Sequence, residues 1–149
     1  MKPDVGVVMQ GFFSTLLGDV APHLSAEYSM GHVGIMGLML HMTGELHDRA
    51  ADIRLAENSE MRSLFSHAAA LVEDEALKQR LTSAAETLDA SLRISVLEAN
   101  NAELAALLIE LQTHVEGSQA SWAAGLEARI WDYLVATMER RELPFPSFG

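Results

Sequence analysis

The chain has 149 residues, a net charge of −11 and no cysteine. This length is typical of one domain, and the acidic balance disfavours nucleic acids and anionic membranes as partners. The lack of cysteine excludes disulfide and thiolate chemistry and favours a cytoplasmic location. Alanine and leucine abound, and no proline lies between Leu24 and Leu143. We therefore expect an all-α fold, an up-and-down bundle of about five helices in a single domain, residues 1–149.

The first helix is predicted to open at Pro3 and Asp4 and to end near Pro22. Its apolar residues recur at intervals of three and four, in a stripe wide enough to pack on two sides. The uncharged run from Val5 to Gly18 is shorter than the roughly 20 residues that span a bilayer. The sequence therefore predicts no transmembrane segment.

A long central helix is predicted from Ser25, a capping residue, to about Glu57. Its first half is apolar on nearly every side, so we expect the rest of the chain to pack around it. Glycines in this half leave places where another helix can come close. Asn58 and Ser59 are expected to end this helix and to start a short one over residues 60–71.

A second long helix is predicted over residues 75–116, capped by Asp74. No glycine or proline interrupts it, although Asn100-Asn101 offers an alternative break. The last helix is expected from about Gln119 to Arg141. Residues 143–149 should form a non-helical tail, whose two phenylalanines, Phe145 and Phe148, we expect to dock on the bundle or on a partner subunit.

Carboxylates and histidines on the two long helices form the first candidate site. Four and three residues separate His41, Glu45 and Asp48, which therefore share one helix face. Glu110 and His114 could face them from the second long helix, and such a set could bind Fe, Mn or Zn. Ferritin-like carboxylate bundles instead supply Glu-x-x-His motifs, which this chain lacks. The simpler interpretation is two solvated helix faces.

A second candidate is one face of the central helix formed by His32, Met36 and Met39. Thioether and imidazole groups suit Cu(I), and beside the glycines these side chains could line a pocket for an apolar small molecule. Ordinary core packing is the simpler interpretation of the methionines. The pair of His41 and Glu45 could also act as a base or a pH switch, but no serine, cysteine or arginine completes a catalytic set.

A polar stripe on the second long helix is interpreted as a solvated face, with Asp89 and Arg93 as an i,i+4 ion pair. The stripe comprises Thr82, Glu86, Asp89, Arg93, Asn100, Glu103 and Glu110.

The leading functional hypothesis is a self-associating interaction protein without catalytic activity. Its basis is the wide apolar stripes of the first two helices and the aromatic tail. A two-fold homodimer is the commonest closed assembly, and no cofactor is required. The alternatives are a ferritin-like metal-dependent enzyme and a binder of apolar small molecules.

Overall fold

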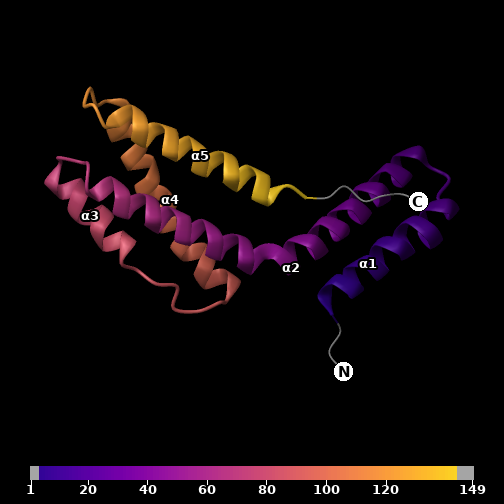
Figure 1. Ribbon diagram of the computed structural model, residues 1–149. Coiled ribbons are helices and arrows are strands. Elements are labelled where there is room, and N and C mark those ends of the chain that lie inside the picture. Colours follow the sequence, from indigo (N-terminus) through magenta and orange to yellow (C-terminus); the bar gives the residue numbers. More distant parts are fainter. Residues whose placement is uncertain (1–3, 144–149) are drawn as a thin grey trace. The chain divides into compact units, whose positions relative to one another are not determined.

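The computed structural model describes residues 4–143, which form five α-helices and no strand (Figure 1). The prediction of an all-α bundle is confirmed. The longest helix has 43 residues. The helices are α1 (Val5–Thr15), α2 (Glu27–Ala69), α3 (Glu75–Ala85), α4 (Ile94–Glu116) and α5 (Ala123–Arg141).

The described part of the chain divides into two compact units, one formed by residues 4–50 with Leu143 and the other by residues 51–142. Helix α2 contributes its first part to the N-terminal unit and its second part to the C-terminal unit. The single domain over residues 1–149 stays a prediction.

The N-terminal unit is a helical hairpin, in which α1 lies alongside the first part of α2 (Figure 1). Asp4, which was predicted to open the first helix, is the N-cap of α1, because its carboxylate accepts hydrogen bonds from the backbone N–H of Gly6 at 2.9 Å and of Val7 at 3.3 Å. After Thr15 the helix widens into a π-helical turn over residues 16–20, followed by a 3₁₀ turn over residues 21–23 that contains Pro22. Proline has no N–H to donate, so the helix ends here and the chain reverses.

The C-terminal unit holds the hydrophobic core. The second part of α2 supplies buried residues at helical intervals, and α3, α4 and α5 each add buried aliphatic side chains. The largest fully buried apolar side chains are Met61, Phe65, Leu81, Leu97, Leu111, Leu126 and Ile130.

Two predicted helix boundaries in this unit are wrong. Helix α2 does not stop at Asn58 and Ser59 but continues to Ala69. An asparagine favours a helix end when its side chain bonds to the nearby backbone. The Asn58 side chain instead reaches other segments, donating to a carboxylate oxygen of Asp89 at 3.0 Å and to the carbonyl oxygen of Leu97 at 3.3 Å.

The helix predicted over residues 75–116 is also divided, by a loop over residues 86–93 and not at Asn100-Asn101. The ion pair between Arg80 of α3 and Glu110 of α4 is incompatible with one continuous helix. Thirty residues of straight helix span about 45 Å, so an unbroken helix could not bring these two side chains together. Folding α4 back also lets both helices contribute to one core.

The remaining predicted boundaries differ less. Asp74 caps α3 as predicted, accepting a hydrogen bond from the N–H of Leu77 at 2.9 Å. Helix α4 ends at Glu116 and α5 at Arg141, as predicted, but α5 begins at Ala123, four residues later than expected. Phe145 and Phe148 lie outside the described residues, so their docking stays a prediction.

Candidate functional site

Helix α1 comes close to α2 at two glycines of α2. A Cβ atom built on Gly37 would lie 3.4 Å from the ring of Phe13, and one on Gly44 would lie 3.3 Å from the Cβ of Met9. These two glycines are seven residues apart, so they lie on the same face of α2. The predicted close approach of a helix is confirmed at these positions. No such neighbour lies within 4 Å of Gly31.

The opposite face of α2 is apolar and exposed. Ile35 lies two residues from Gly37 and Met42 two residues from Gly44, which is about 200° around the helix in each case. The exposed fraction is 61% for Ile35 and 62% for Met39. We call this surface the α2 stripe, and its members, all exposed, are Tyr28, His32, Ile35, Met39, Met42 and Leu46.

The N-terminal unit as a whole buries little. Among residues 4–50, Val33 is the only hydrophobic side chain in the buried core. The interpretation of Met36 and Met39 as core packing is wrong, because both are exposed, as is His32. Their binding of Cu(I) or of an apolar ligand stays a prediction. His32 is held in place, with Nδ1 2.8 Å from the carbonyl oxygen of Tyr28 and its ring edge-on to the Tyr28 ring.

Three of the predicted metal ligands line one pocket in the hairpin. His41, Glu45 and Asp48 belong to a pocket of about 550 Å³, together with His47 and Asp4. The Nε2 atom of His41 is buried there and has no hydrogen-bond partner.

The other two predicted ligands lie in the C-terminal unit. Glu110 forms the ion pair with Arg80, and the ring of His114 stacks on Trp122 with a centroid distance of 6.2 Å. Within residues 4–143, no group of three or more histidine, aspartate or glutamate side chains is arranged to hold a metal ion. Metal binding therefore stays a prediction.

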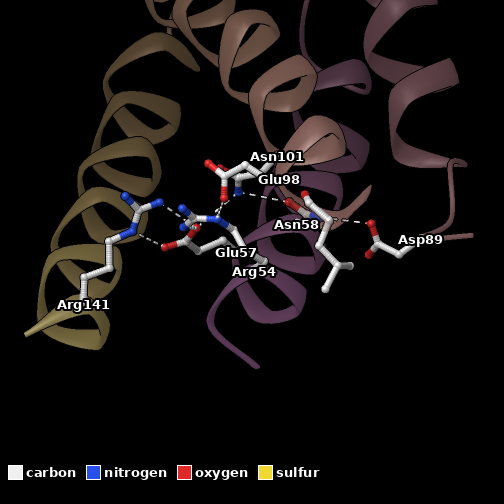
Figure 2. Close-up of polar contacts among 8 residues, drawn as sticks. Arg54, Glu57, Asn58, Asp89, Glu98, Asn101 and Arg141 are labelled. Atoms are coloured by element: carbon white, nitrogen blue, oxygen red, sulfur yellow. Dashed lines mark hydrogen bonds and ion pairs between the residues drawn. The ribbon is translucent and has the colours of Figure 1, made fainter. Parts of the chain in front are cut away.

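The C-terminal unit contains a buried polar network that the sequence did not reveal (Figure 2). Glu57 of α2 is fully buried and accepts two hydrogen bonds from Arg141 of α5, at 2.6 and 2.8 Å. Arg54 adds a third at 3.0 Å. Burial alone would raise the pKa of Glu57, but the hydrogen bonds and charges of Arg141 and Arg54 outweigh it and hold the pKa below its usual value.

Asp89 anchors the loop between α3 and α4 to the same network. It accepts two hydrogen bonds from Arg62, at 2.8 and 3.0 Å, and one each from Asn58 and Asn100. The bonds from Arg62 lower the pKa of Asp89 to about 2, against the opposing effect of burial. The predicted ion pair of Asp89 with Arg93 is wrong, because Arg62 takes that position and Asp89 lies in a loop.

The network links α2, α4, α5 and the loop, and its carboxylates are occupied by arginine and asparagine donors. Asn58 and Asn101 complete it, with the amide of Asn101 donating to the Oδ1 atom of Asn58 at 3.0 Å. Such an arrangement fixes the register of the helices and offers no open carboxylate for catalysis. The sequence did hold a signal, because Asn58 lies three and seven residues before Met61 and Phe65, on the core face of α2.

By length and composition, one described helical segment, Val5–His23, could cross a membrane, with a mean hydropathy of 1.2 and none of it buried. A helix at an assembly interface can have the same composition, so this segment alone does not identify a membrane protein. The chain matches no protein-family model, no curated protein and no solved structure.

Proposed function

We propose that this protein is a self-associating helical bundle without catalytic activity, and that its N-terminal hairpin is the element that associates. The observation that carries the proposal is the exposed α2 stripe on a hairpin in which, among residues 4–50, Val33 is the only buried hydrophobic side chain. Contiguous exposed apolar surface on a small domain marks an interaction site.

The distribution of charge supports the same conclusion. Between residues 5 and 44 the only charged side chains are Asp19 and Glu27, whereas residues 51–142 carry 16 acidic and 8 basic residues. The acidic residues keep the C-terminal unit in water. The hairpin has few charges. Each half-exposed aliphatic side chain of the α2 stripe that a partner buries would contribute on the order of 1 kcal/mol to the free energy of association.

The partner we propose is a second copy of this chain, in a two-fold homodimer located in the cytoplasm. A two-fold dimer uses the same surface twice, so one apolar face is sufficient for a closed assembly. A lipid surface is a poorer candidate, because residues 4–50 contain one basic residue, Arg49, and the net charge is −11.

Size-exclusion chromatography with light scattering tests the proposal. At micromolar concentration we expect twice the chain mass of 16.2 kDa. A monomer over the whole accessible concentration range would refute self-association. Elemental analysis of the same sample tests the metal-dependent alternative, since near-stoichiometric Fe, Mn or Zn would contradict a non-catalytic bundle.

A further inference from the structure

The sequence intervals between members of the α2 stripe are the same whether they are counted from its N-terminal or its C-terminal end. Successive members are separated by four, three, four, three and four residues from Tyr28 to Leu46. This alternation repeats every seven residues and is the pattern of a two-helix coiled-coil seam, here about 27 Å long.

We propose that two copies of the chain pair their α2 helices antiparallel along this stripe. The inference rests on the self-association proposed above and names its surface and geometry. Antiparallel pairing that covers the whole stripe matches every member with another member. It places Tyr28 opposite Leu46 of the second copy, His32 opposite Met42, and Ile35 opposite Met39.

Charge favours the antiparallel arrangement over the parallel one. Glu27 adjoins one end of the stripe, and Glu45, Asp48 and Arg49 lie around the other. Both ends are therefore net negative, and these end charges do not distinguish the two orientations, whereas the charge of the segment that follows does. After the stripe the chain continues into residues 51–142, which carry a net charge of −8. Parallel helices would direct two such segments to the same end, and antiparallel helices direct them to opposite ends.

The polar groups along the stripe are compatible with burial. No side chain from Tyr28 to Gly44 carries a fixed charge. The hydroxyl of Thr43, beside the stripe, donates to the carbonyl oxygen of Met39 at 2.7 Å, and His32 Nδ1 pairs with the carbonyl oxygen of Tyr28. Gly31, next to His32, leaves open space that allows a close approach of the second helix.

The first test places like charges in the seam. In the double variant Ile35→Glu with Met39→Glu, four carboxylates would meet at the centre of the dimer, and we expect the dimer dissociation constant to rise about 100-fold or more in sedimentation equilibrium. The matched control is Ile109→Glu on α4, because Ile109 is 65% exposed and Ile35 is 61% exposed. This control should leave the dissociation constant unchanged.

The second test distinguishes the two orientations. In Ile35→Lys with Met39→Glu, opposite charges face each other only in the antiparallel dimer, so we expect the dissociation constant to return to within about tenfold of the wild-type value. In a parallel dimer each introduced charge would face the same charge on the other copy. A dissociation constant as high as that of the double glutamate variant would therefore overturn the antiparallel geometry.

The absence of cysteine allows a covalent test in the full chain. Under mild oxidation, Tyr28→Cys with Leu46→Cys should give a disulfide-linked dimer, while Leu46→Cys alone should remain non-covalent. Covalent dimers of Leu46→Cys alone would show parallel pairing and overturn the inference.

The outcomes separate the two proposals. A wild-type chain that is always monomeric refutes self-association itself. A wild-type dimer that persists in the double glutamate variant refutes only the α2 interface. A monomer that partitions into phosphatidylcholine vesicles would assign the stripe to a lipid surface and overturn both.

Discussion

Asp89→Asn removes one negative charge from the C-terminal unit and changes few atoms. The carboxylate of Asp89 is 9% exposed and accepts hydrogen bonds from Arg62, Asn58 and Asn100. An asparagine keeps one acceptor oxygen but cannot balance the guanidinium charge of Arg62. We therefore expect the variant to fold with a lower free energy of unfolding near neutral pH.

The pKa of Asp89 gives the magnitude and the pH range. The pKa is about 2 in the folded protein and 3.8 for the unperturbed group. At 1.36 kcal/mol for each pKa unit, the ionised carboxylate contributes about 2 kcal/mol to stability. Because the folded-state pKa is depressed, this contribution is fully present above pH 3.8 and is lost as the pH falls through about 2.

Urea denaturation of wild type and variant at several pH values measures this contribution. The gap in unfolding free energy between the two proteins should be about 2 kcal/mol near pH 6 and should shrink to a few tenths near pH 2. The matched control is Asp132→Asn, because Asp132 is an exposed residue of α5, and its gap should be near zero at both pH values. If the difference in unfolding free energy between wild type and Asp89→Asn were the same near pH 6 and near pH 2, the assignment of a depressed pKa would be refuted.

Two further predictions concern the network and the hairpin. Glu57→Gln leaves Arg141 and Arg54 without their buried carboxylate, so we expect a loss of about 3 kcal/mol in urea denaturation, against little change for the exposed control Glu127→Gln. A loss below about 1 kcal/mol would contradict a buried ion pair. Gly44→Leu forces a side chain against Met9 and should lower the helical circular dichroism and the thermal midpoint. Gly34→Ala, which meets no neighbour within 4 Å, should keep or raise both.

Local sequence signals were sufficient for the helical class and for several helix ends. Asp4 was predicted to open α1 and Asp74 to cap α3 from residue type and position alone, and both accept hydrogen bonds from the backbone that follows them. The end of α5 at Arg141 was also predicted. Each of these features depends on a few neighbouring residues, and one sequence is enough to recognise them.

The errors arose where distant partners decided the outcome. Asn58 was predicted to end a helix, but its partners Asp89 and Asn101 lie 31 and 43 residues away. Asp89 was assigned to a helix, but its bonds to Arg62 and Asn58 stabilise a loop. No local propensity contains these contacts, because they exist only once the second part of α2, the loop and α4 have packed together.

The candidate site shows the same division. The residues of the α2 stripe and its glycines are visible in the sequence, but a helix that is apolar on all sides does not show which face is covered. The structure decided this, because Gly37 and Gly44 admit α1 on one side and leave Ile35 and Met39 exposed on the other. The sequence by itself therefore determined that this is an acidic all-α protein with an apolar N-terminal segment. Only the tertiary structure decided which helices pack and which charges are buried, because long-range contacts are selected by the shape of the whole core.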